Sequence, residues 1–222
     1  MDLMAFLSGS LDISLNLHKI ICELEELDKT WVVNDVPVQD HSFGRIPGEQ
    51  EIRLWSIPRS SMKLITMLAI ASRATNILDI GTSAGYSALW LSVAAKLNKG
   101  RVHTIEMFEP KVKLARKYIE QSGMSKYINL IVDDIANVLN NRPKSDGKID
   151  FVLFDADKEN HLQYLRLLEH NLSKNAVLVV DNASNFRHLQ SKLFEYLDSS
   201  DDYLNYWLDY ENGLEIFLRR EV

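Results

Sequence analysis

The stretch that decides the fold is Asn76-Ile77-Leu78-Asp79-Ile80-Gly81-Thr82-Ser83-Ala84-Gly85-Tyr86-Ser87. Its first five residues predict a buried strand, and the glycines at its centre predict a tight turn. The apolar segment 87–95 predicts a helix directly after the turn. A strand that ends at glycines and continues as a helix leaves free backbone N–H groups and the positive end of the helix dipole at one point. That point suits an anionic group of a ligand.

The next apolar segment, 102–105, ends on Glu106. An acidic side chain at this place can accept hydrogen bonds from two ribose hydroxyls, so the unit is typical of a site for an adenosine-bearing cofactor. The dinucleotide fingerprint has two glycines close together, whereas here the spacing is Gly81-x-x-x-Gly85. This spacing fits a turn around an amino-acid tail, with Asp79 facing an ammonium and the helix start facing a carboxylate. The alternative is a strand–turn–helix whose glycines serve only steric needs.

At this point the chain resembles the class I S-adenosylmethionine (SAM)-dependent methyltransferases, and the remaining pattern agrees with their topology. Strands and helices alternate from residue 76 onward. We expect strands near 76–81, 101–106, 127–132, 149–155 and 175–181, and helices near 60–72, 86–97, 110–122, 158–171 and 185–198. Asn212-Gly213 predicts a hairpin between two last strands, near 203–210 and 213–220. The resemblance implies a Rossmann-like α/β fold, with a seven-stranded sheet of which six strands are parallel and one reversed, and helices on both faces.

Composition sets the broad class of the protein. The 222 residues are 46% hydrophobic and 25% charged, which is typical of one globular domain. We expect a single domain over 1–222, in which 1–58 is a helical and loop segment that forms a lid or a dimer interface, and 59–222 is the cofactor-binding core. The net charge of −6 argues against nucleic acid as a partner but leaves room for a local basic patch. One cysteine, no signal peptide pattern and no long apolar run lead us to expect a cytoplasmic protein without membrane contact.

Acidic side chains follow five consecutive predicted strands. Because ligands of open parallel sheets bind beyond the carboxyl ends of the strands, these side chains should meet at one edge. Asp155, Asp181 and Asn182 form an all-oxygen set that suits Mg²⁺. Lys158 follows Asp155 by three residues and could act there as a general base. The alternatives are that Asp155 neighbours a cofactor without metal, that Asp181-Asn182 forms a turn and helix cap, and that Lys158 is a solvated helix-start residue.

The segments 154–160 and 180–182 resemble the signature motifs of the cation-dependent O-methyltransferases, the family that includes catechol and caffeoyl-CoA O-methyltransferases. The resemblance implies a SAM-dependent O-methyltransferase with Mg²⁺ or another divalent cation, a small-molecule acceptor, and a homodimer. The implied metal ligands are Asp155, Asp181 and Asn182. Lys158 is the implied catalytic residue, together with Asp155. The residues expected to bind SAM are Asp79, Gly81, Ser83, Gly85, Ser87, Glu106, Asp134 and Asp155.

Two departures from that family concern the acceptor more than the cofactor. Met62-Lys63 stands where relatives carry a Gly-Gln pair, and residues 183–186 run almost directly into a predicted helix where relatives have a longer loop. We therefore expect an open acceptor pocket, or one built from residues 31–58. The alternative functions are a metal-independent methyltransferase that acts on another acceptor, such as a modified RNA base, and a nucleotide-binding oxidoreductase or non-catalytic cofactor-binding module.

Overall fold

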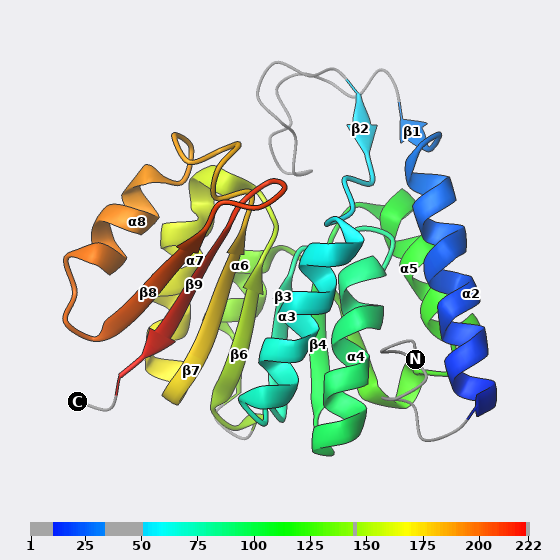
Figure 1. Cartoon of the computed structure of the whole chain (residues 1–222), viewed down its shortest axis with the longest axis horizontal. Coiled ribbons are helices and arrows are strands. Elements are labelled where there is room, and N and C mark those ends of the chain that lie inside the picture. Colours follow the sequence, from blue (N-terminus) through cyan, green and yellow to red (C-terminus); the bar gives the residue numbers. More distant parts are fainter. Residues whose placement is uncertain (1–10, 34–50, 144–145, 221–222) are drawn as a thin grey trace.

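The centre of the molecule is a seven-stranded sheet (Figure 1). The computed structural model describes residues 11–33, 51–143 and 146–220. The strands follow one another across the sheet in the order β5 (Ile128–Val132), β4 (Arg101–Glu106), β3 (Asn76–Ile80), β6 (Ile149–Phe154), β7 (Leu172–Asp181), β9 (Leu214–Arg219) and β8 (Tyr203–Leu208). The first five are parallel, and β9 is antiparallel to both of its neighbours. Six strands therefore run one way and one is reversed, which confirms the predicted fold.

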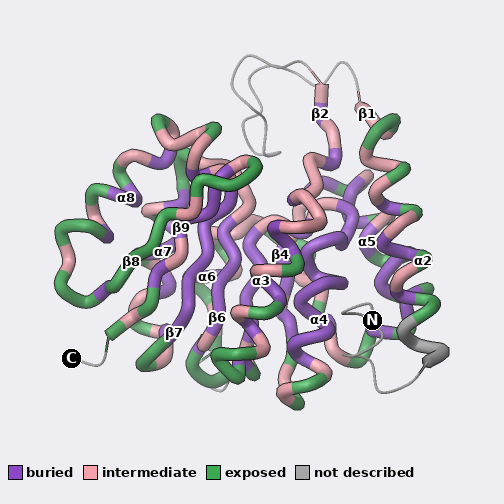
Figure 2. The backbone as a smooth tube through the Cα atoms, viewed as in Figure 1, coloured by how far each residue is buried: buried purple, intermediate pink, exposed green. Residues whose placement is uncertain are grey.

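Helices cover both faces of the sheet. One face packs against α3 (Arg59–Ala71), α4 (Tyr86–Asn98) and α5 (Glu109–Gln121), and the other against α6 (Ile135–Asn140), α7 (His161–Leu168) and α8 (Ser191–Asp198). Successive strand residues alternate between the two cores: Ile77 belongs to the first and Leu78 to the second. Because both faces are covered, the central strands are buried along most of their length (Figure 2). This accounts for their nearly continuous apolar sequences.

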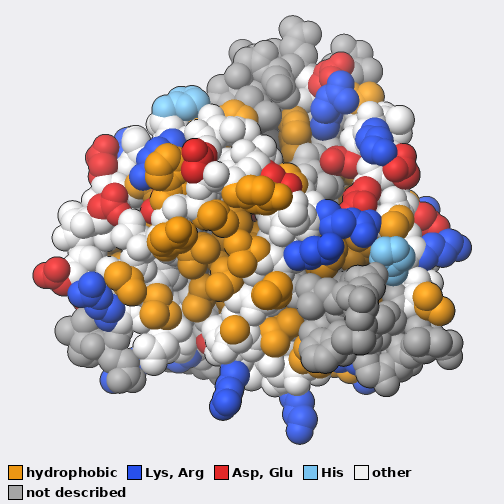
Figure 3. Space-filling view, viewed as in Figure 1, with side chains coloured by type: hydrophobic (Ala, Val, Ile, Leu, Met, Phe, Trp, Pro, Cys, Tyr) orange, Lys and Arg blue, Asp and Glu red, His pale blue; other side chains and the backbone are white. Residues whose placement is uncertain are grey.

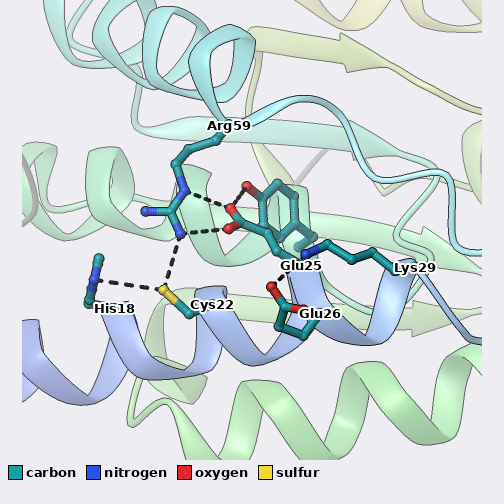
Figure 4. Close-up of polar contacts among 7 residues, drawn as sticks. His18, Cys22, Glu25, Glu26, Lys29 and Arg59 are labelled. Carbon is teal, nitrogen blue, oxygen red and sulfur yellow. Dashed lines mark hydrogen bonds and ion pairs between the residues drawn. The ribbon is translucent and has the colours of Figure 1, made fainter.

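The amino-terminal helix α2 (Leu11–Asp28) lies against α4 and is joined to the core by a polar network. The carboxylate of Glu25 accepts hydrogen bonds from Nε and Nη2 of Arg59, at 2.7 and 2.6 Å (Figure 4). The hydroxyl of Tyr86, the first residue of α4, donates to the same carboxylate at 2.6 Å. Glu25 thus ties α2 to the starts of α3 and α4. This attachment fixes the position of the last residue of the helix, Asp28.

The chain between α2 and α3 belongs to the segment that was predicted to contain helix and loop. In the described part of it, β1 (Val32–Val33) pairs with β2 (Ile52–Arg53) in a small antiparallel sheet. The segment 54–56 then runs beside the glycine turn, where the Leu54 carbonyl accepts a hydrogen bond from Ser83 Oγ at 2.9 Å. The backbone N–H of Ser56 lies 3.4 Å from both carboxylate oxygens of Asp28. We call residues 54–56 the strap; residues 34–50 of the segment expected to form a lid or a dimer interface fall outside the described residues.

Three elements differ from the sequence prediction. The helix expected over 158–171 consists of η4 (Lys158–Asn160), α7 and η5 (Glu169–Asn171). The helix expected from residue 185 begins only at Ser191, because residues 182–189 form turns. Helix α6 was not predicted; it is six residues long, too short to show an apolar period, and Asp134 caps it by accepting from the Asn137 N–H at 3.0 Å.

Apolar side chains also gather on the surface. Segment 1–58 was expected to form a lid or a dimer interface, and within it the α2 residues Leu17, Ile20, Ile21 and Leu24 pack against the core of the same chain. Exposed apolar side chains instead form a continuous area on the face seen in Figure 3. The exposed large apolar residues of β8 and β9 are Leu204, Tyr206, Trp207 and Leu218. The homodimer stays a prediction. Among the described helices, none has the length and apolar character needed to cross a membrane.

Candidate active site

A cavity of about 600 Å³ lies at the carboxyl ends of the parallel strands. Four of these strands end in or just before residues that line it: Gly81 after β3, Glu106 in β4, Asp155 after β6 and Asp181 in β7. The crossover helices return each strand to the same direction, so these ends meet at one edge although the residues lie far apart in sequence. Seven acidic and two basic residues line the cavity: Asp28, Glu106, Asp134, Asp155, Asp157, Glu159 and Asp181, with Lys111 and Lys158. The cavity therefore suits a ligand with positive charge.

Glu106 organises the glycine turn. Its Oε2 accepts from the backbone N–H of Ser83 at 2.9 Å, and its Oε1 accepts from the N–H groups of Met107 and Phe108 at 2.9 Å each. Ser83 has a positive φ of 48°, a conformation that this hydrogen bond helps to hold. The carboxylate is partly exposed and lines the cavity. Asp134, which caps α6, lines the same cavity.

Lys158 and Asp155 form an ion pair just after β6, two strands across the sheet from β4 and Glu106. Lys158 Nζ donates to Asp155 Oδ1 at 2.8 Å, and the two side chains are 14% and 16% exposed. The pairing follows from the local sequence, because η4 begins at Lys158, three residues after Asp155, and turns the lysine back toward the strand end. In this position the amine faces the cavity beside a carboxylate. An amine so placed can take a proton from a bound hydroxyl.

Asp181 is the most constrained acid of the site. Its side chain is 2% exposed, and no described residue makes a hydrogen bond to its Oδ1 atom. Burial raises the pKa of Asp181 above its ordinary value, and the charge of Asp155 raises it further. The next residue, Asn182, has a positive φ of 60° and lines the cavity too. A buried, unpartnered carboxylate oxygen that faces other oxygen donors is chemically incomplete without a proton or a cation.

Comparison with known proteins gives the family of this chain. The sequence profile described as "O-methyltransferase" matches residues 47–191. The chain belongs to the O-methyltransferase family. It is 35% identical over 121 residues to a catechol O-methyltransferase of Mycobacterium tuberculosis, covering 54% of this chain and 53% of that protein. It is 27% identical over 180 residues to a flavonoid 3',5'-methyltransferase of Vitis vinifera, covering 76% and 75%.

A solved structure agrees in fold. The structure of an SAH-bound methyltransferase from Podospora anserina superposes with a TM-score of 0.71 at 18% identity, covering 95% of this chain and 94% of that one. At this identity the likeness concerns the fold alone. The chain spans about half the length of the M. tuberculosis relative that it matches.

Family resemblance implies a metal, and the oxygen donors of this O-methyltransferase fit one. In the described ranges, no three His, Cys, Asp or Glu side chains are grouped to hold a metal ion. The predicted set contains only two carboxylates, Asp155 and Asp181, and needs the Asn182 amide oxygen as its third donor. All three line one cavity, and the unpartnered Oδ1 of Asp181 is a buried oxygen that would be free to bind a cation. Such hard oxygen donors suit Mg²⁺.

The structure brings together eight of the predicted site residues and leaves three aside. Those that line the cavity are Gly81, Ser83, Glu106, Asp134, Asp155, Lys158, Asp181 and Asn182. Asp79, Gly85 and Ser87 lie outside its lining. Asp79 Oδ2 instead accepts from the hydroxyls of Ser87 and Thr104, at 2.8 Å each. Gly85 caps α4 with a φ of 94°.

The pleat of β3 explains why Asp79 does not line the cavity. Its side chain points to the same face of the sheet as Ile77 and reaches the start of α4, whereas the cavity lies beyond the carboxyl end of the strand. Conversely, the cavity includes residues whose part in the site the sequence did not single out, among them Asp28, Ser56 and Lys111. They come from α2, the strap and α5. Apart from the first-turn position of Lys111 after Pro110, no sequence pattern marks them.

Gly81 permits the close approach of β3 and β6. A Cβ atom at this position would lie 2.5 Å from the carbonyl oxygen of Asp155, and the φ is +105°. We expect Gly81→Ala to destabilise the fold by about 1–3 kcal/mol beyond the cost of the left-handed conformation. Gly123→Ala is the matched control, because Gly123 also has a positive φ (73°) but would meet no atom within 4 Å. Urea unfolding of both variants measures the difference. Equal losses of stability would contradict the assigned contact.

Because Asp79 is buried, we expect the free energy of unfolding to depend on pH. Burial, together with the charges of Asp155 and Glu106, raises its pKa to about 7, despite hydrogen bonds from Thr104 and Ser87. Between pH 4 and 7 the folded state then binds more protons than the unfolded state, so Asp79 lowers stability as pH rises. Asp79→Asn removes this cost, and its advantage over the wild type should grow by up to about 3 kcal/mol from pH 5 to 8.

Denaturant unfolding at pH 5, 6, 7 and 8 tests this prediction. Asp201→Asn, at an exposed position before β8, is the control and should differ from the wild type by a constant amount. A difference for Asp79→Asn that does not change with pH would show that this carboxyl group does not titrate in the range.

Proposed function

We propose that this protein transfers a methyl group from SAM to a hydroxyl of a small acceptor with two vicinal oxygens, such as a catechol, with the help of a divalent cation. The observation that carries the proposal is that one cavity is lined both by Glu106, an acid placed to bind a ribose, and by the proposed metal-binding and catalytic residues Asp155, Lys158, Asp181 and Asn182. Family membership supports the reaction type, and the names of the catechol and flavonoid relatives support the acceptor class.

The charge of the cavity agrees with these ligands. SAM carries a sulfonium and an ammonium, and a divalent cation adds two positive charges, so an excess of acidic lining residues would stabilise their binding. The same excess disfavours a polyanionic acceptor such as RNA. The reaction is an in-line displacement in which the protein mainly positions donor and acceptor. Glu106 would hold the ribose hydroxyls, and Asp134 would contact the adenine amine.

The transfer itself needs one proton acceptor. A lone pair of the acceptor oxygen forms the new bond to the methyl carbon, while the bond from that carbon to sulfur breaks and sulfur keeps the electron pair. Lys158 Nζ first gives one proton of its ammonium to solvent, and the neutral amine, which Asp155 orients through the 2.8 Å contact, then takes the hydroxyl proton. Asp155, Asp181 and Asn182 would hold the cation. When bound, the cation would lower the pKa of the hydroxyl and align the two acceptor oxygens.

Two measurements test the proposal. The first is calorimetric titration of SAM and S-adenosylhomocysteine (SAH) in magnesium buffer, where we expect saturable one-site binding. The second is methyl transfer from labelled SAM to a panel of catechols, matched monophenols and methoxyphenols, with and without EDTA. Transfer only to the vicinal diols, and only with the metal, is the expected result. Binding of SAH with no transfer to any acceptor would favour a cofactor-sensing module instead, and no binding would overturn the cofactor assignment.

A further inference from the structure

Lys111 is a buried cation that the proposed reaction does not use. It lies in the first turn of α5, is 5% exposed and lines the cavity. Its Nζ lies 5.0 Å from the centroid of the Trp55 ring in the strap. In the described part of the chain, no residue makes a hydrogen bond or an ion pair with this ammonium. The other basic residue of the cavity, Lys158, is already paired with Asp155.

The surroundings of Lys111 favour a further partner. Burial lowers its pKa, and the charges of Glu106, Asp155 and Asp28 oppose that effect from a distance, while Lys158 adds to it. A buried ammonium without a hydrogen-bonding partner costs free energy, which an anion in the cavity would recover. The carboxylates nearby are engaged: Glu106 accepts three backbone N–H groups, and Asp28 faces the N–H of Ser56. Among the described residues that line the cavity, the ammonium of Lys111 would therefore stabilise an anionic group of a bound ligand.

The position of Lys111 indicates which anion. The strap that contacts it also contacts the glycine turn, through Ser83 Oγ and the Leu54 carbonyl. Lys111 thus faces the part of the cavity between the strap and Glu106. SAM has one anionic group, the carboxylate of its amino-acid end. Ser87, which the family resemblance placed among the SAM-binding residues, is 5% exposed and donates its hydroxyl to Asp79.

We propose that Lys111 binds the carboxylate of the amino-acid end of SAM and SAH, with the Trp55 ring holding the lysine side chain in place. The inference rests on the proposed function, because it assumes that SAM occupies this cavity. Asp28 would then position the strap by accepting a hydrogen bond from the Ser56 N–H. Helix α2, which carries Asp28, is itself held in place by the contacts between Glu25 and Arg59. The amino-terminal helix would in this way support recognition of the cofactor.

The test compares ligands that keep or lack the carboxylate. SAH has the whole amino-acid end, decarboxylated SAM has the methylated sulfonium and the amine but no carboxylate, and 5'-deoxy-5'-methylthioadenosine lacks the whole end but keeps the ribose and adenine. Calorimetry would give the Kd of each for the wild type, Lys111→Met, Lys111→Arg and the control Lys113→Met. Lys113 lies on the same helix and is exposed. Thermal unfolding of every variant checks the fold, and methionine should pack on Trp55 without loss of stability.

We expect Lys111→Met to weaken SAH binding about 10- to 100-fold, as for loss of a charge-assisted hydrogen bond. Decarboxylated SAM and methylthioadenosine should change by less than about threefold, and Lys111→Arg should recover most of the SAH affinity. Equal weakening of SAH and methylthioadenosine would overturn the inference and assign Lys111 to the ribose or to the fold. An unchanged SAH affinity would overturn it too. Failure of the wild type to bind any of the three ligands would instead refute the proposed function.

Discussion

Changing Lys158 to methionine should lower kcat for methyl transfer by about 10²- to 10⁴-fold, the usual contribution of a general base. The side chain is 14% exposed and its Nζ lies 2.8 Å from Asp155 Oδ1, so the variant removes the amine at the point where the acceptor hydroxyl would lie. SAH should bind within about threefold of the wild-type affinity, because the proposal assigns Lys158 no contact with the cofactor. Steady-state kinetics with the acceptor found in the panel, together with SAH calorimetry, gives both numbers.

Lys113→Met is the matched control for this change. It removes a lysine from an exposed position on α5, where its partner is Glu109 one turn away, and should leave kcat unchanged. A kcat within threefold of the wild type would remove Lys158 from the mechanism.

Removal of divalent cations is the second change with a large expected effect. EDTA should lower turnover about 100-fold or more, and excess Mg²⁺ should restore it, since the two carboxylates and the amide would have no cation to hold. Mg²⁺ should also raise the Tm of the wild type by several degrees, because a ligand at 100 times its Kd adds about 2.7 kcal/mol. Asp181→Asn should abolish both the Mg²⁺-dependent activity and the Mg²⁺-dependent shift in Tm.

The Asp181→Asn variant separates loss of the metal from loss of the fold. Asparagine keeps the shape of the side chain and removes a buried charge, so the metal-free variant should be at least as stable as the metal-free wild type. Asp201→Asn, at an exposed position, should behave like the wild type in every assay. If turnover survives EDTA, and Mg²⁺ shifts the Tm of the variant and of the wild type equally, the metal site is refuted. The remaining function would then be that of a metal-independent O-methyltransferase.

The alternation of strands and helices could be read from the sequence because the signals are local. Continuous apolar runs gave the central strands to within a residue or two at most ends, and glycines gave the turn after β3. Once the strands are parallel, the acids that end or follow them must meet at one edge, so Glu106, Asp155 and Asp181 could be grouped in advance. Elements without a periodic signal were missed, as helix α6 and the turns over residues 182–189 show.

The sequence by itself determined where the strands, turns and helices lie along the chain and which acidic side chains follow the strands. These features depend on residues that are neighbours in the sequence. Which side chains face the cavity was decided by the tertiary structure. Asp79 is adjacent in sequence to the turn yet points to α4, since the pleat of β3 directs it out of the sheet. Lys111 and Asp28 lie far from the motifs and reach the cavity only because α5 and α2 are packed beside it. Burial and contact between distant segments have no local sequence signal.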